Sequence, residues 1–257
     1  MKLRANPLFY IALFLFFIIS ILVVVRLFHK DTPSSRVPAK GLIAVVIDDW
    51  GYSLNNIPVA EEIKYPLTCA VLPNLKNSYA ASSRLKASGF EIILHLPMQP
   101  REKYRLEKDT ITLNADKKEL KRILDQDLAS VAFAEGISNH MGSLVTEDSR
   151  VSGMILEEAK SRGLYFLDSY VTADSVCPVL ARRINTRFAK RDVFLDNKDD
   201  MNYIRFQVAR LESLAEKNGK ALGIGHDRKN TLLVLKEEMP KLAKKGYKFV
   251  FVSEIAK

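Results

Sequence analysis

Two adjacent carboxylates, Asp48 and Asp49, stand at the end of the unbroken apolar run "GLIAVVIDDW" (41–50). Neighbouring negative charges at the end of a buried strand repel each other and lose their hydration. A bound metal ion or a proton-transfer role offsets that cost, whereas a pair of turn aspartates on the surface does not incur it. Taken alone, the pair is compatible with both interpretations.

Three of the four histidines also stand at or near the ends of apolar runs, namely His95, His140 and His226. Polar residues in similar positions are Asn139, Ser143, Asp168, Ser169 and Asp196. If each buried imidazole were structural, each would need a hydrogen-bond partner of its own. One shared metal ion accounts for the imidazoles and the paired aspartates together, so the sequence favours a metal site.

Such a set of residues predicts metal-dependent hydrolysis. Two imidazoles and one carboxylate form an open Zn²⁺ site, although other divalent ions use the same ligands, so zinc is a preference. A second carboxylate takes a proton from the attacking water, and an imidazole on the far side protonates the leaving group of an amide or ester. The sequence contains no G-x-S-x-G, P-loop or G-x-G-x-x-G motif, the signatures of serine hydrolases and nucleotide-binding proteins.

Strands and helices that alternate along the chain must position these residues. Continuous apolar runs predict strands buried on both faces, at residues 42–47, 67–72, 91–96, 136–138, 164–168, 192–196, 221–225 and 248–253. Amphipathic patterns predict helices at residues 77–88, 116–132, 148–162, 200–218 and 229–245. The alternation indicates an α/β fold, a distorted or incomplete (β/α) barrel of seven to eight mainly parallel strands, with an open doubly wound sheet as second choice. In a barrel, the carboxyl ends of all strands meet on the face where active sites lie.

The N-terminal residues predict a membrane anchor. No charged residue occurs from Leu8 to Val25, a run long enough to span a bilayer, and no small-residue cleavage site follows it. We therefore expect a tail at 1–7, an uncleaved transmembrane helix at 8–27, a Pro- and Ser-containing linker at 28–40 and one barrel domain at 41–257, with a cleaved signal peptide as the alternative. Basic residues flank the apolar run on both sides, so charge alone leaves its orientation open.

The net charge of +9 is partly clustered in two basic runs, 181–191 and 240–248. Such runs are usually solvated faces, and they would otherwise attract anionic polymers or lipid head groups. No nucleic-acid-binding motif accompanies them, so no nucleic-acid partner is expected. Cys69 and Cys177 are too few for a disulfide framework, and their spacing does not decide whether they pair.

Six short motifs occur in order along the segment from Gly41 to Lys257: "VVIDDWGYS", "HLPMQP", "SNHMGS", "FLDSY", "RDVFLDN" and "GIGH". Together they resemble the divergent polysaccharide deacetylase family, a branch related to the metal-dependent carbohydrate esterases that remove N-acetyl groups from glycans. The resemblance implies a distorted (β/α) barrel and a bacterial extracytoplasmic protein, in agreement with the predicted anchor.

The resemblance also implies roles for individual residues. Asp49 matches the metal ligand and Asp48 the catalytic base, while His226 matches the histidine that acts as the acid. Arg191 and Asp196 match the groups that orient the base and the acid. Asn139, Ser143, Asp168 and Ser169 are expected to bind substrate or to support the metal ligands.

The metal site departs from the pattern of the better-known deacetylases, which place two histidines four residues apart on one loop. Gln99 stands four positions after His95, so the second imidazole must come from elsewhere, and His140 is the expected donor.

The expected function is a membrane-anchored, metal-dependent hydrolase with its barrel on the periplasmic side of a bacterial membrane. It would remove acetyl groups from an acetylated polysaccharide such as peptidoglycan or an exopolysaccharide. The alternatives are a non-catalytic envelope module that binds a glycan or a protein, and a different metal-dependent hydrolase.

Overall fold

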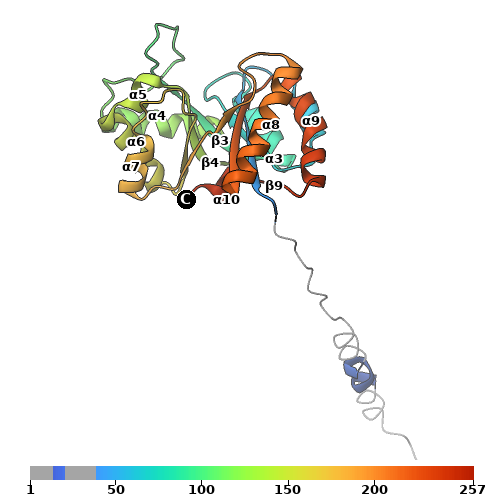
Figure 1. Cartoon of the computed structure of the whole chain (residues 1–257). Coiled ribbons are helices and arrows are strands. Elements are labelled where there is room, and N and C mark those ends of the chain that lie inside the picture. The colour runs from blue at the N-terminus through green and yellow to red at the C-terminus, as the bar shows by residue number, and fades with distance from the viewer. Residues whose placement is uncertain (1–13, 21–38) are drawn as a thin grey trace, which may run out of the picture. The chain divides into compact units, whose positions relative to one another are not determined.

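The structure, a computed structural model, describes residues 14–20 and 39–257, and the second range forms one compact unit (Figure 1). The strands of this unit are β1 (Leu42–Trp50), β2 (Thr68–Val71), β3 (Glu91–Met98), β4 (Ala134–Met141), β5 (Tyr165–Asp168), β6 (Phe188–Lys190), β7 (Val193–Phe194), β8 (Lys220–His226) and β9 (Lys248–Val250). Its helices are α2 (Ile57–Glu61), α3 (Ser78–Ala87), α4 (Lys117–Ser130), α5 (Ser143–Glu147), α6 (Ser149–Ser161), α7 (Cys177–Ile184), α8 (Met201–Asn218), α9 (Lys229–Lys244) and α10 (Val252–Ile255).

All strand pairs are parallel, in the order β6-β5-β4-β3-β2-β1-β8-β7, and β9 also pairs with β1. The two strands at the ends of this order, β6 and β7, are separated in the chain by Arg191 and Asp192 alone. Because the three Cα steps from Lys190 to Val193 span at most about 11 Å, the sheet must curl until its edges approach each other. The prediction of an incomplete, mainly parallel (β/α) barrel is confirmed, and the open doubly wound sheet was the wrong alternative.

Both faces of the curled sheet are buried, which explains the continuous apolar runs in the sequence. Along β1, Ile43 and Ile47 belong to the core between the sheet and its helices. Ala44 and Val46 belong to a second core inside the sheet, which the segment around α10 completes. A strand with two apolar faces reads as an unbroken run because neither set of alternate side chains meets water.

The five predicted helices correspond to α3, α4, α6, α8 and α9, within a few residues at each end. Three of them start at an aspartate whose carboxylate accepts a backbone N–H of the first turn, as Asp116, Asp148 and Asp200 do. These side chains satisfy amide groups that have no partner within the helix, and they fix where each helix begins.

Short elements were predicted less well. The predicted strand 248–253 ends at Val250, and α10 follows, because the Glu254 carboxylate accepts the backbone N–H of Phe251 at 2.8 Å and closes a helical turn. The predicted strand 192–196 is only the two residues of β7, while β6 and the helices α2, α5 and α7 were not predicted. The basic run 181–191 spans the end of α7, a turn and β6. Short apolar runs fit a strand or a helix equally well, so periodicity alone does not separate them.

The predicted tail 1–7, and most of the predicted anchor 8–27 and linker 28–40, lie outside the described residues. Residues 14–20 are helical. In the part of the chain that the structure describes, no helix has the length and apolar character needed to cross a membrane. Cys69 and Cys177 are both buried and free, so they do not form a disulfide with each other.

Candidate metal centre

The sequence-predicted aspartates and histidines lie toward the carboxyl ends of neighbouring strands. Asp48 and Asp49 are near the end of β1, His95 is in β3, His140 is in β4 and His226 ends β8. The β1–β8 register places Asp48 directly beside His226. Because these strands are parallel, residues up to 178 positions apart in the chain meet at the same edge of the sheet.

Both aspartates of the pair point toward the same imidazole, although successive side chains of a regular strand point to opposite faces. Asp48 Oδ2 lies 3.6 Å and Asp49 Oδ1 lies 3.4 Å from Nε2 of His95. Asp49 has a left-handed φ of 66°, and the β1–β2 register shifts between Ile47 and Trp50. This irregularity turns both carboxylates into the site, and strained backbone of this kind is typical of functional sites.

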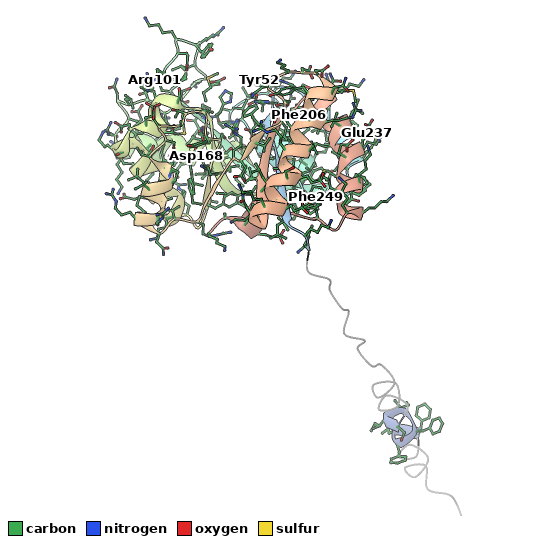
Figure 2. The ribbon with its side chains drawn as sticks, viewed as in Figure 1. Tyr52, Arg101, Asp168, Phe206, Glu237 and Phe249 are labelled. Atoms are coloured by element: carbon green, nitrogen blue, oxygen red, sulfur yellow. The ribbon has the colours of Figure 1, made fainter. Side chains whose placement is uncertain are left out.

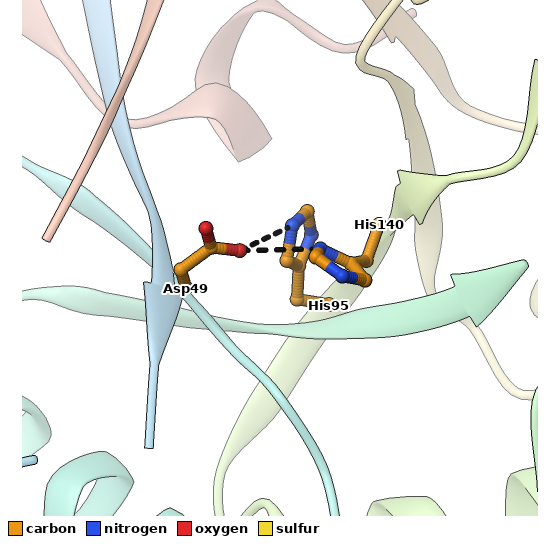
Figure 3. A group of neighbouring side chains, drawn as sticks. All are labelled: Asp49, His95 and His140. Atoms are coloured by element: carbon orange, nitrogen blue, oxygen red, sulfur yellow. Dashed lines mark ion pairs between the residues drawn. The ribbon is translucent and has the colours of Figure 1, made fainter. Parts of the chain in front are cut away.

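One oxygen of Asp49 faces two imidazoles (Figure 3). Its Oδ1 atom is 3.4 Å from Nε2 of His95 and 3.2 Å from Nδ1 of His140. The two rings meet edge to face with their centroids 5.0 Å apart. The second nitrogen of His95, Nδ1, lies 2.8 Å from Oγ of Ser138, and this hydrogen bond fixes the ring with Nε2 toward Asp49.

These three residues fit a divalent metal ion. One ligand atom from each of Asp49, His95 and His140 lies within 4.8 Å of the other two. Asp48 Oδ1, Asp49 Oδ1 and His140 Nε2 are buried without a hydrogen bond of normal geometry to any described residue. Buried polar atoms are normally paired, so the two carboxylate oxygens are available to a ligand. Two imidazole nitrogens and a carboxylate oxygen form the donor set of an open zinc site, which other divalent ions also use.

The surroundings of the two aspartates shift their pKa values in opposite directions. Burial raises the pKa of Asp48 above its usual value, because nothing nearby fully offsets the loss of hydration. Burial also acts to raise the pKa of Asp49, but the imidazoles of His140 and His95 outweigh it and lower that pKa well below its usual range. Asp49 therefore stays ionised, as a metal ligand must, while Asp48 has the higher proton affinity that a base requires.

On the opposite side of Asp49 lies His226, whose Nε2 is 3.9 Å from Asp49 Oδ2. Its Nδ1 lies 2.8 Å from Oδ1 of Asp196, a fully buried carboxylate that also accepts the backbone N–H of His226 and the hydroxyl of Thr231. Burial acts to lower the pKa of His226, but Asp196 outweighs it and raises that pKa. The pair is therefore arranged to hold a proton on His226 with Nε2 toward the site.

The second glycine of the "GIGH" motif makes room for this pair. A Cβ atom on Gly225 would lie 2.8 Å from Cγ2 of Thr231 and 3.4 Å from Oδ2 of Asp196. Any larger residue would push Thr231 away from the carboxylate that it supports. Steric exclusion therefore explains why this position of the motif is glycine.

Arg191 does not contact the predicted base directly. Its Nε and Nη2 donate hydrogen bonds of 2.6 Å to the backbone oxygens of Ser169 and Tyr170. In the described part of the chain, no ion pair joins it to Asp48. Arg191 therefore stabilises the loop after β5 by hydrogen bonds. Its interaction with Asp48 is a Coulombic attraction without direct contact.

The other predicted polar residues mainly hold loops together. The Asn139 side chain accepts the backbone N–H of Ser169 and donates to the backbone oxygen of Met141. Asp168 accepts the backbone N–H of Tyr170 and the hydroxyl of Ser175, and Ser143 accepts the backbone N–H of Arg101. Among the four candidates, only Ser169 has a buried side-chain oxygen without a partner among the described residues. It is therefore the best placed to contact a ligand. Figure 2 shows Asp168 within the body of the unit.

Sequence analysis missed Glu107, from the loop between β3 and α4. Its Oε1 lies 3.5 Å from Nε2 of His140 and accepts the hydroxyl of Tyr52 at 3.2 Å. The sequence offers no signal for it, because it is one of several charges in the polar stretch 101–109. Gln99 is not a substitute metal ligand, since its side-chain oxygen accepts the backbone N–H of Leu113 at 3.0 Å.

Residues 45–256 match the divergent polysaccharide deacetylase family. The chain belongs to this family. It is 34% identical over 197 residues to the uncharacterized protein YibQ of Escherichia coli (strain K12), a match that covers 77% of this chain and 62% of YibQ. An uncharacterized protein of Haemophilus influenzae is 29% identical over 197 residues, which cover 77% of this chain and 70% of that protein. The matched region therefore spans less than two thirds of the Escherichia coli relative.

Solved structures share the fold. An uncharacterized protein from Agrobacterium tumefaciens superposes with a TM-score of 0.80 at 21% identity, covering 87% of this chain and 92% of that one. The catalytic domain of a peptidoglycan N-acetylglucosamine deacetylase from Eubacterium rectale gives 0.53 at 13% identity, covering 82% and 87%. A Bacillus anthracis protein described as a CE4 family pseudoenzyme gives 0.51 at 13% identity, covering 84% and 66%. These similarities establish a deacetylase-like fold, which active and inactive proteins both use.

Proposed function

We propose that this protein is a metal-dependent hydrolase that removes acetyl groups from an envelope or extracellular polysaccharide. One observation carries the proposal: Asp49, His95 and His140 converge on a candidate metal site, with Asp48 beside them. Family membership directs the choice of substrate class to an acetylated carbohydrate. Zinc is the preferred ion because two imidazoles and a carboxylate suit it.

The site contains one group suited to accept a proton and one suited to donate a proton. When bound, the metal ion would polarise the acyl oxygen and make the attacking water more acidic. Asp48, whose pKa is raised by burial, would accept a proton from that water. His226 would give a proton to the leaving nitrogen or oxygen, while Asp196 holds the Nδ1–H of the ring. Asp48 would thus act as the base and His226 as the acid, from neighbouring strands beside Asp49.

The uncharged N-terminal run supports attachment of this hydrolase to a bacterial membrane by residues 8–27, with the barrel in the periplasm. A polymer anchored in the envelope, such as peptidoglycan, or an exopolysaccharide would be within reach of such an enzyme. Both the location and the glycan are parts of the proposal, and acetate release from a panel of acetylated glycans tests the second.

Metal content of the purified full-length chain tests the centre itself. We expect near-stoichiometric zinc or another divalent ion by mass spectrometry, with most of it lost in His95→Ala and in His140→Ala. His29→Ala is the matched control, because the sequence places this histidine before the barrel domain, and it should keep the metal. Retention of metal by folded His140→Ala would contradict the ligand set, and absence of metal after reconstitution would contradict the proposal.

The second candidate is a non-catalytic module that binds a glycan or a protein on the same barrel. The fold shared with a CE4 family pseudoenzyme favours this alternative, because the fold is compatible with loss of activity. Acetate release that depends on Asp48 separates the two candidates, since a binding module does not need a base.

A further inference from the structure

Glu107 is the inward-facing residue of a loop that is otherwise mostly in contact with solvent. The loop between β3 and α4 projects beyond the helices beside it (Figure 1), and residues 101–106 and 108 are exposed. The Glu107 side chain, by contrast, is 21% exposed and lies against His140, whose side chain is 12% exposed. The loop thus places one carboxylate beside the candidate metal centre.

Two side chains converge on the same oxygen of Glu107. Its Oε1 accepts the phenol of Tyr52 at 3.2 Å and lies 3.5 Å from Nε2 of His140. Nδ1, the other nitrogen of that ring, faces Asp49 at 3.2 Å. Glu107 therefore occupies the far side of the imidazole from the candidate metal position, and it links the loop that follows β1 to the end of β4.

The loop is held in this position at three points. Gln99 Oε1 accepts the backbone N–H of Leu113 at its base. The hydroxyl of Thr110 donates to the backbone oxygen of Glu107 at 2.7 Å, which closes a turn around the residue. Asp109, with a left-handed φ of 60°, pairs with Arg122 of α4 at 3.0 Å. Gln99, which stands where the better-known deacetylases have a second histidine, thus helps to position the loop that reaches the histidine used here.

We propose that Glu107 is a positioning residue for His140: its carboxylate, 3.5 Å from Nε2 without a hydrogen bond in this structure, accepts the Nε2–H once a metal ion is bound and so holds Nδ1 toward that ion. A neutral imidazole carries one proton, and a carboxylate on Nε2 selects the tautomer that leaves the Nδ1 lone pair free for a metal. The inference rests on the proposed metal centre and adds the residue that fixes the geometry of its second imidazole. Tyr52 supports Glu107 by donating to the same oxygen.

Zinc affinity of the full-length chain, measured by competition with a chromogenic chelator, tests the inference. Loss of a carboxylate partner of a metal-bound histidine typically weakens metal affinity by about 10- to 100-fold. We expect this loss in Glu107→Ala, a smaller loss in Glu107→Gln, which keeps an acceptor, and at most about threefold in Tyr52→Phe. Glu102→Gln is the matched control from the same loop and should bind zinc like the wild type.

A spectroscopic readout separates positioning from general loosening of the loop. In ¹⁵N-edited NMR of the zinc-loaded wild type, the Nε2–H of His140 should be visible and protected from exchange with water. It should be lost in Glu107→Ala, while the signal of the His95 ring persists. Unchanged zinc affinity in Glu107→Ala, with zinc bound by the wild type, would overturn this inference alone. A wild type that binds no metal would overturn both it and the proposed function.

Discussion

Two buried carboxylate sites lie at opposite ends of the parallel strands, and they differ in how their oxygens are used. Glu91, at the first residue of β3, accepts the hydroxyl of Thr68 at 2.8 Å and that of Tyr165 at 2.7 Å. At the carboxyl end of the strands, Asp48 and Asp49 each retain a buried oxygen without a normal hydrogen bond to any described residue. The same fold thus contains one satisfied and one unsatisfied set of buried charges.

This difference separates a structural role from a functional one. A buried carboxylate stabilises a fold only when hydrogen bonds compensate its loss of hydration, as at Glu91. Buried carboxylate oxygens that lack hydrogen bonds, beside a strained backbone, reduce stability, and they persist where a ligand or a reaction uses them.

Replacement of the proposed base should affect activity and not folding. In Asp48→Asn we expect acetate release to fall about 10³-fold, since a general base contributes typically 10²–10⁴-fold. The free energy of unfolding should not decrease, because burial raises the pKa of Asp48 and the amide carries no buried charge. Enzyme assays and denaturant unfolding on the same preparation measure both effects. Strong destabilisation would instead place Asp48 in the same class as Glu91.

Removal of the satisfied carboxylate should have the reverse effect. Glu91→Ala leaves the hydroxyls of Thr68 and Tyr165 without their acceptor, which should lower the free energy of unfolding by about 3 kcal/mol. Zinc affinity and the rate of acetate release of the folded variant should stay within twofold of the wild type. Denaturant titration gives the first quantity, and a loss of metal binding in the folded protein would refute the contrast.

Asp196 combines both features, because it is fully hydrogen-bonded and also orients a proposed catalytic group. We expect Asp196→Asn to lower the rate about 10- to 100-fold, less than removal of a catalytic group itself. Since Asp196 raises the pKa of His226 against the effect of burial, its removal should lower that pKa. Activity that needs protonated His226 is lost as the pH rises through this pKa, so the alkaline limb of the pH–rate profile should move to lower pH. An unshifted limb would exclude His226 as the titrating acid.

Gln99 provides the smallest and most specific test. Gln99→Leu removes the acceptor of the Leu113 N–H and should cost about 1 kcal/mol of stability. Gln99→His, which recreates two histidines four residues apart, should not raise zinc affinity, because His140 already occupies the second imidazole position. Chelator competition on both variants checks this, and tighter zinc binding by Gln99→His would show that the site accepts the ligand spacing of the better-known deacetylases.

The sequence indicated the barrel because its strands are buried on both faces and its long helices have clear amphipathic patterns. Residue types and strand-end positions indicated a metal site among the paired aspartates and the three histidines, and the family resemblance narrowed the ligands to Asp49, His95 and His140. The sequence did not reveal α2, α5, α7 or β6, which are short and lack a distinctive period. The resemblance implied that Arg191 orients the base, and in the structure Arg191 donates to the backbone oxygens of Ser169 and Tyr170.

By itself, the sequence determined the parallel α/β fold and the set of residues able to bind a metal and move protons, because burial patterns and side-chain chemistry are local properties of the chain. Only the tertiary structure decided how these residues are used. The left-handed backbone at Asp49 brings two consecutive carboxylates to one imidazole, and the β3–α4 loop brings Glu107 to His140. Both depend on backbone conformation and on contacts between distant segments, which no local pattern encodes.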